Sequence, residues 1–122
     1  MTLPDDDSIL LLQNPRCSKS RATKALLEER GVAFVERSYL DAPLSGEELE
    51  DLAQRIGRPV REWTRKGEDA FSETGLTDAS DDQAWIDAIV ANPILMERPI
   101  VVRGKRAVVA RPPAHALTLL DE

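Results

Sequence analysis

Residues 8–31 of the chain read SILLLQNPRCSKSRATKALLEERG, an apolar run followed by a polar turn and a helical pattern. The run Ser8–Leu12 has the length and composition typical of a strand buried on both faces of a sheet. Gly31 is a good residue for ending the helix that follows. The apolar face of that helix would consist of Ala22, Ala25, Leu26 and Leu27. The stretch therefore predicts a strand, a tight turn and a helix.

Cys17, the only cysteine of the chain, lies in this turn at the predicted helix N-terminus. Unpaired N–H groups and the positive end of the helix dipole favour an anion there, either a thiolate or a bound oxyanion. Arg16, Lys19 and Arg21 add positive charge nearby, which would lower the pKa of the thiol. The alternative is a small buried hydrophobe, as many free cysteines are. The polar surroundings favour the nucleophile.

Composition limits the classes of protein to consider. A chain of 122 residues with 42% hydrophobic content fits a single domain. Its net charge of −6 argues against a general nucleic-acid or acidic-membrane surface. The acidic stretch Asp5–Asp7 and the lack of a long apolar run indicate neither a signal peptide nor a membrane span. We therefore expect a cytoplasmic monomer, in which one cysteine cannot form an internal disulfide.

The middle of the chain is predicted to be helical. Residues 32–39 have strand composition and would complete a β-α-β unit with the first strand and helix. Ser45 and Glu48 form a capping-box pattern for a helix running to about Ile56. Another helix is expected from Asp81 to residue 92. Residues 45–92 thus predict a helical insertion, in which Trp63 and Trp85 would anchor the core.

The last third predicts an antiparallel hairpin of residues 99–102 and 107–110, joined by a turn at 103–106. A short helix would follow over residues 113–120, packing through Ala116, Leu117 and Leu120. The element order is then β-α-β, a helical insertion and β-β-α. This order predicts one α/β domain over residues 1–122, with a thioredoxin-like fold and a mixed four-stranded sheet.

Four segments in this order resemble the glutathione- and glutaredoxin-coupled arsenate reductase family, ArsC. They are residues 14–21 (NPRCSKSR), 65–66 (RK), 97–102 (ERPIVV) and 110–112 (ARP). The resemblance implies a catalytic cysteine at Cys17 and three arginines that hold the oxyanion, which are Arg65, Arg98 and Arg111. It also implies supporting roles for Asn14, Ser20 and Arg21.

Details of the resemblance lead to narrower expectations. The Ser20 hydroxyl would either hydrogen-bond the thiolate or cap the helix. The Arg98–Pro99 bond would be cis, as is common beside the active cysteine of thioredoxin-like folds. Gln13 stands where many family members have histidine, so the strength of Cys17 ionisation is left open. Neither a metal nor a bound cofactor is required, and glutathione would serve as a co-substrate.

The leading hypothesis is an enzyme that reduces arsenate or a similar oxyanion, with glutathione and glutaredoxin as external thiols. One alternative is a redox-responsive regulator of the same superfamily that binds RNA polymerase. Such regulators usually carry a Cys-x-x-Cys switch, and here Ser20 takes the second position. Another alternative is a glutathione-dependent thiol reductase with a different substrate.

Overall fold

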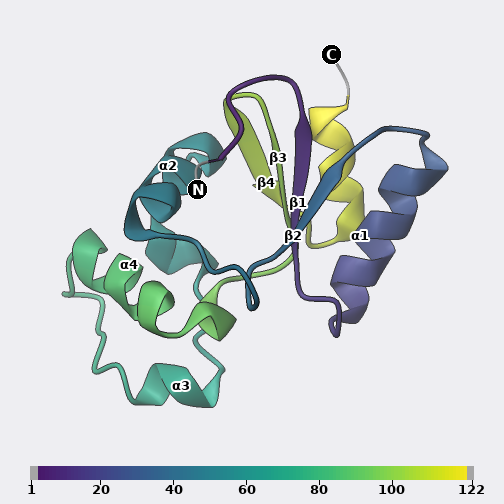
Figure 1. Ribbon diagram of the computed structural model, residues 1–122. Helices are drawn as coiled ribbons and strands as arrows, with labels where there is room; N and C mark the ends of the chain where they lie inside the picture. Colours follow the sequence, from purple (N-terminus) through teal and green to yellow (C-terminus); the bar gives the residue numbers. More distant parts are fainter. Residues whose placement is uncertain (1–2, 121–122) are drawn as a thin grey trace.

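The computed structural model describes residues 3–120, which form a four-stranded sheet covered on both faces (Figure 1). The strand order is β2-β1-β3-β4. β1 pairs in parallel with β2 and antiparallel with β3, and β3 pairs antiparallel with β4. The predicted mixed sheet is therefore confirmed. The strands are β1 (Ile9–Gln13), β2 (Val35–Ser38), β3 (Ile100–Arg103) and β4 (Arg106–Val109).

Helices form a layer on each side of the sheet (Figure 1). One layer consists of α1 (Ser18–Glu29) and the 3₁₀ helix η3 (Pro113–Leu119). The opposite layer consists of α2 (Gly46–Ile56), η1 (Val60–Trp63), α3 (Asp69–Ser72), α4 (Asp82–Ala91) and η2 (Pro93–Leu95). No helix within residues 3–120 has the length and apolar character needed to cross a membrane.

Strand β1 divides the apolar interior into two clusters. Leu10 and Leu12 belong to the larger cluster under the helical insertion, whereas Ile9 and Leu11 belong to the cluster under α1 and η3. Because successive side chains of a strand point to opposite faces, a continuous apolar run is required here. Both tryptophans, Trp63 and Trp85, are fully buried in the larger cluster, as predicted.

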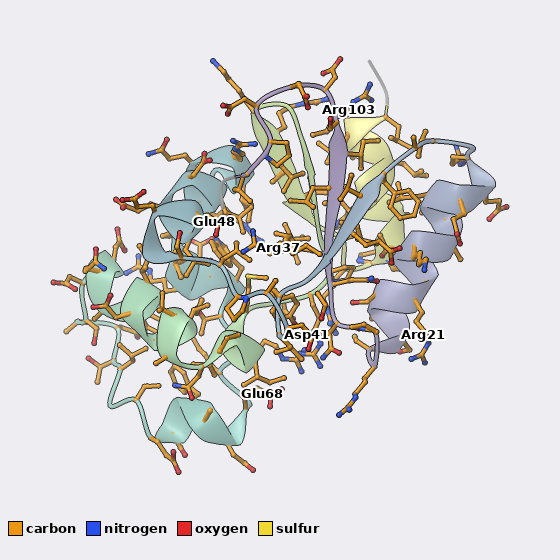
Figure 2. The ribbon with its side chains drawn as sticks, viewed as in Figure 1. Arg21, Arg37, Asp41, Glu48, Glu68 and Arg103 are labelled. Atoms are coloured by element: carbon orange, nitrogen blue, oxygen red, sulfur yellow. The ribbon has the colours of Figure 1, made fainter. Side chains whose placement is uncertain are left out.

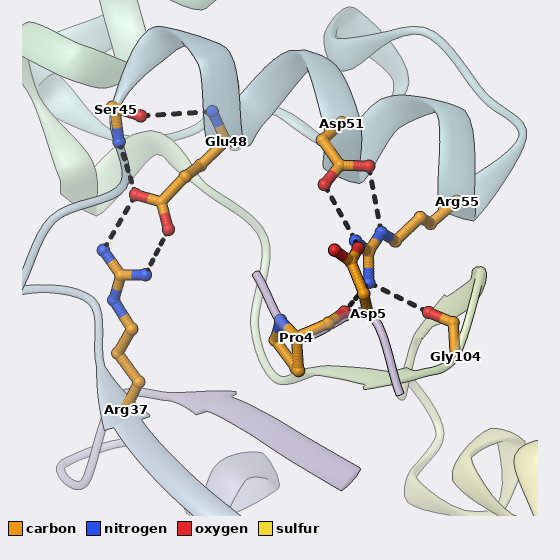
Figure 3. Close-up of polar contacts among 8 residues, drawn as sticks. All are labelled: Pro4, Asp5, Arg37, Ser45, Glu48, Asp51, Arg55 and Gly104. Carbon is orange, nitrogen blue, oxygen red and sulfur yellow. Dashed lines mark hydrogen bonds and ion pairs between the residues drawn. The ribbon is translucent and has the colours of Figure 1, made fainter. Parts of the chain in front are cut away.

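A buried ion pair joins the edge strand β2 to helix α2 (Figure 3). The guanidinium of Arg37 donates to both Glu48 carboxylate oxygens, at 2.6 and 3.1 Å. Glu48 and Ser45 also form the predicted capping box, with reciprocal hydrogen bonds of 3.0 and 3.1 Å. Burial alone would raise the pKa of Glu48, but the bonds from Arg37 and the Ser45 N–H lower it. The helical insertion is thereby fixed to the sheet at its edge.

Arg55 fastens the far end of α2 to two other segments (Figure 3). Its guanidinium pairs with Asp51 one turn earlier and donates to the carbonyl oxygens of Pro4 and Gly104, at 2.6 and 2.9 Å. Gly104 has a φ of 59° in the two-residue turn between β3 and β4, which a side chain would disfavour. One side chain thus connects the N-terminal segment, α2 and the hairpin.

Four sequence predictions were wrong in detail. The buried residues of α1 are Ser20, Thr23 and Leu27, whereas Ala22 and Ala25 are exposed. The two buried hydroxyls are tolerated because each is hydrogen-bonded, Thr23 to the Lys19 carbonyl and Ser20 to a backbone N–H.

The remaining differences concern element type and length. Strand β2 spans four residues rather than the predicted 32–39, and Val35 on this edge strand is 62% exposed. Residues 113–119 form a 3₁₀ helix that begins after Pro112, and its buried residues are Ala116 and Leu119. The hairpin turn is tighter than predicted, since Arg103 and Arg106 pair within the sheet.

The Arg37–Glu48 pair leads to a test of stability. Replacing Glu48 with alanine should lower the free energy of unfolding by about 3 kcal/mol, because Arg37 would keep a buried charge without its carboxylate. Urea denaturation would measure the change. The loss should be full above the unfolded-state pKa of about 4.3 and should fade as the pH falls through the lower folded-state pKa. Glu50→Ala, on the exposed face of α2, is the matched control, and equal losses in both variants would contradict the assignment.

Candidate active site

Cys17 is the N-cap residue of α1, in a turn held by backbone hydrogen bonds. Its N–H donates to the Asn14 carbonyl at 2.9 Å, and its own carbonyl accepts from the Arg21 N–H at 3.1 Å. Asn14 stabilises the turn further, because its Oδ1 accepts from the Arg16 N–H at 3.0 Å. The Ser20 hydroxyl oxygen accepts from the Asn14 N–H at 3.2 Å. Asn14 and Ser20 therefore shape the turn that presents the thiol.

The surroundings of Cys17 lower its pKa to about 7. Partial burial acts in the opposite direction and raises it. The backbone N–H of Ser20 and the guanidinium of Arg98 favour the thiolate form and lower the pKa, and the Lys19 N–H acts in the same direction. The helix N-terminus and one arginine thus overcome the effect of burial, so that the thiolate is accessible near neutral pH.

The largest effect of a charge on Cys17 is that of Arg98, a residue far away in the sequence, rather than that of a basic residue in its own loop. Arg16 and Lys19 have exposed side chains. Arg21, on the first turn of α1 (Figure 2), donates to the Pro15 carbonyl at 3.1 Å. Sequence proximity was misleading here, because long side chains beside a helix start extend into water.

The side chain of Gln13 is hydrogen-bonded to the neighbouring strand. It is buried at the end of β1, and its amide donates to Glu36 on β2. Glu36 also pairs with Lys24 of α1 at 3.2 Å. Gln13 therefore takes part, through Glu36, in a polar connection between the sheet and α1. The ionisation of the thiol is favoured instead by the helix N-terminus and Arg98.

The three predicted arginines come from three segments. Arg98 lies two residues before β3 and has a cis bond to Pro99, as expected. Arg111 follows β4, and its Nη1 donates to the Arg98 carbonyl at 3.0 Å. Arg65 follows η1, and its N–H donates to the Leu95 carbonyl at 2.6 Å. An antiparallel bridge between Thr64 and Met96 holds the Arg65 segment beside the approach to β3.

Two carboxylates, neither predicted from the sequence, lie among these arginines. Glu68 Oε1 lies 3.1 Å from Arg65 Nε and 4.0 Å from Arg98 Nη1. Glu97 Oε1 lies 3.7 Å from Arg65 Nη1 and 3.5 Å from Arg111 Nη1. Glu68 is labelled in Figure 2. In the sequence, Glu68 follows Arg65 by three residues and Glu97 directly precedes Arg98. Ordinary surface ion pairs have the same spacing, so the sequence did not mark these carboxylates as part of a site.

Several buried polar atoms of this cluster have no hydrogen-bond partner among residues 3–120. They are the Tyr39 hydroxyl, Arg65 Nε, and Arg98 Nε and Nη1. Buried polar groups in folded proteins are almost always paired, so a ligand with acceptor atoms would satisfy the donors left free at this place. The ion pairs of Arg65 and Arg98 with Glu68 lack hydrogen-bond geometry and leave these atoms free.

Tyr39 is the third group that was not predicted. Its side chain is 1% exposed, and it follows β2 in the larger apolar cluster. Burial raises the pKa of the hydroxyl to about 12, although the charges of Arg98 and Arg65 oppose this rise. Tyr39 therefore keeps its proton and can act as a neutral donor beside the arginines. In the sequence, Tyr39 has the appearance of an ordinary core residue, so nothing there marks it as part of the site.

A cavity of about 350 Å³ is lined by Arg65, Lys66, Glu68, Glu97 and Arg111 among others, whereas Cys17 and Arg98 are not among its lining residues. A larger cavity of about 680 Å³ lies along β1 and β2, and none of the predicted site residues lines it. Within residues 3–120, no three His, Cys, Asp or Glu side chains are arranged to hold a metal ion. The smaller cavity combines positive charge with free donors, which suits a small anion.

Comparison with known proteins identifies the family of the chain. A model of the ArsC family matches residues 12–119. The chain belongs to the ArsC family. It is 43% identical to the arsenate reductase of Neisseria meningitidis serogroup B over 106 residues, which cover 85% of this chain and 91% of the relative. It is also 43% identical to YfgD of Escherichia coli, named an uncharacterized protein, over 92% of this chain and 96% of that one.

Solved ArsC structures share the fold. The arsenate reductase from Vibrio cholerae superposes with a TM-score of 0.88 at 40% identity, covering 93% of this chain and 98% of that one. The putative arsenate reductase from Yersinia pestis gives a TM-score of 0.85 at 37% identity, covering 91% and 99%. The resemblance drawn from the sequence, and the mixed four-stranded α/β fold expected of ArsC proteins, are both confirmed.

The contact between Arg98 and Cys17 can be tested through thiol reactivity. The rate of iodoacetamide alkylation of Cys17 should rise with pH about a midpoint near 7, since only the thiolate reacts. Arg98→Gln should move the midpoint upward by about one unit. Arg16→Gln removes an equal charge from an exposed loop residue and should leave it unchanged. A shift in the Arg16 variant and none in the Arg98 variant would assign the charge to the loop.

Proposed function

We propose that the protein is an arsenate reductase that uses glutathione and glutaredoxin as external reductants. The observation that carries this proposal is a thiol whose pKa is lowered by a guanidinium, that of Arg98, whose buried Nε and Nη1 have no hydrogen-bond acceptor among residues 3–120. A tetrahedral oxyanion would supply acceptor oxygens to those donors and an electrophilic centre to the thiolate. Named arsenate reductases among its ArsC relatives support the same assignment.

The first step joins Cys17 to arsenic. The thiolate attacks arsenic(V), one arsenate oxygen leaves as water after protonation, and a covalent thiol-arsenate adduct forms. Arg65, Arg98 and Arg111 hold the remaining oxygens and offset the repulsion between the thiolate and the anion. Tyr39, whose hydroxyl keeps its proton, can donate a hydrogen bond to the same oxygens.

External thiols complete the reduction because the chain has one cysteine. Glutathione displaces a second oxygen as water and binds arsenic through sulfur. A glutaredoxin thiolate then attacks the glutathione sulfur, and the electron pair of the arsenic–sulfur bond reduces arsenic to the trivalent state. The glutathione leaves on glutaredoxin as a mixed disulfide, and hydrolysis of the Cys17–arsenic bond releases arsenite. A monomer in the cytoplasm, where thiols are kept reduced, fits this chemistry.

Replacement of Cys17 by serine should abolish turnover, because the hydroxyl is a far weaker nucleophile at neutral pH. The measurement is arsenite formation from arsenate with glutathione, glutaredoxin and a system that regenerates reduced glutathione. The wild-type protein without glutaredoxin is the control for direct reduction by glutathione. An unchanged rate in Cys17→Ser would refute the mechanism.

Each of the substitutions Arg65→Ala, Arg98→Ala and Arg111→Ala should lower kcat/KM by about 10²-fold, since a charged donor to the oxyanion is lost. Arg61→Ala, which removes an exposed arginine of η1, is the matched control and should behave as the wild type. Wild-type kinetics in all three site variants would exclude this oxyanion site. Circular dichroism and urea denaturation would show whether each variant is folded.

A further inference from the structure

Carboxylates offset part of the positive charge at the site before any substrate binds. Three guanidinium groups, those of Arg65, Arg98 and Arg111, are accompanied by the carboxylates of Glu68 and Glu97. Lys66, which lines the same cavity, adds a positive charge, and Cys17, with its pKa lowered to about 7, adds a partial negative one. The two carboxylates therefore cancel part of the attraction that the cations would exert on an anion. Glu68 and Glu97 also lie where they repel the oxygens of a fully deprotonated anion.

Free acceptors lie beside the free donors of the site. The ion pairs of Glu97 span 3.5 and 3.7 Å, longer than ordinary hydrogen bonds, and its side chain is 28% exposed. Glu68 lies 4.0 Å from Arg98 and contacts Arg65 without hydrogen-bond geometry. Both carboxylates thus keep lone pairs that no hydrogen bond within residues 3–120 uses. A ligand that satisfies the whole site must bring acceptor oxygens for the arginines and a hydroxyl hydrogen for a carboxylate.

We infer that Glu68 and Glu97 select oxyanions that carry a proton, so that the site accepts arsenate and phosphate and rejects sulfate. Arsenate and phosphate keep one or two protons near neutral pH, and a bound As–OH or P–OH group can donate to a carboxylate. Sulfate has no proton to donate, so its oxygens would face the carboxylates unpaired. A site built to accept a hydrogen bond discriminates strongly against a ligand that lacks the donor.

The inference rests on the proposed oxyanion site but concerns its selectivity. It assigns Glu68 and Glu97 the role of specificity-determining residues, although both reduce the positive charge that an anion would feel. It also explains why carboxylates persist among the arginines of a site that must bind a negative ligand. The substrate class is then a protonated tetrahedral oxyanion.

The test uses inorganic phosphate and sulfate as probes, because neither oxidises the thiol. Isothermal titration calorimetry of the reduced wild-type protein at pH 7.5 and constant ionic strength would give both dissociation constants. We expect phosphate to bind at least about 10-fold more tightly than sulfate. Protection of Cys17 from iodoacetamide by phosphate would locate the binding, since the chain has one cysteine.

The variants Glu97→Gln and Glu68→Gln keep the side-chain size and offer sulfate an amide donor. In at least one of them the preference for phosphate should fall below about threefold, mainly because sulfate binds more tightly. Glu73→Gln, an equal charge change at an exposed residue beyond α3, controls for net charge and should retain the wild-type preference. Equal affinity for the two anions in the wild type, no binding of phosphate, or an unchanged preference in both glutamine variants would overturn the inference.

These outcomes are independent of arsenate reduction. If the wild-type protein prefers phosphate but forms no arsenite, the proposed reductase activity fails and the selectivity stands. If arsenite forms and the wild type does not distinguish phosphate from sulfate, the selectivity alone fails.

Discussion

The proximity of the Arg98 guanidinium to Cys17, which acts with the N–H groups at the start of α1 to lower the pKa of the thiol, is set by the sheet. Leu12 pairs with Ile100, so the turn that follows β1 lies beside the segment that precedes β3. Cys17 starts α1 at the end of one strand, and Arg98 lies just before the other. Antiparallel pairing of β1 with β3 therefore brings a thiol and a cation together from opposite ends of the chain.

Elements with strong local signals could be predicted from the sequence. Their local residue pattern is enough to predict the structure. This holds for the apolar run at β1, the capping box of Ser45 and Glu48, and the hairpin turn at Gly104. The buried face of α1 could not be predicted, because Ser20 and Thr23 are buried by virtue of hydrogen bonds that the folded turn supplies. Polar residues satisfied in this way have the appearance of surface positions in a sequence.

The candidate site was predictable in part. Cys17 could be proposed from its place before a helix, and the three arginines from a resemblance spread over the whole chain. Glu68, Glu97 and Tyr39 were not found, because their importance depends on neighbours brought close by folding. For the same reason, the basic residues of the loop did not identify the arginine with the largest effect on the pKa of Cys17. Distances in the sequence say little about which charge reaches a sulfur, whereas the order of strands in the sheet decides it.

The dispersed origin of the arginines has a consequence for biosynthesis. Cys17 leaves the ribosome early, while Arg98 and Arg111 belong to the last third of the chain. Before β3 inserts beside β1, the cysteine lacks the guanidinium of Arg98, one of the groups that lower its pKa. Completion of the sheet then adds the last of the groups that activate the nucleophile, so the thiol of a nascent or partly folded chain is less ionised, and less reactive toward oxidants and electrophiles, than the thiol of the finished domain.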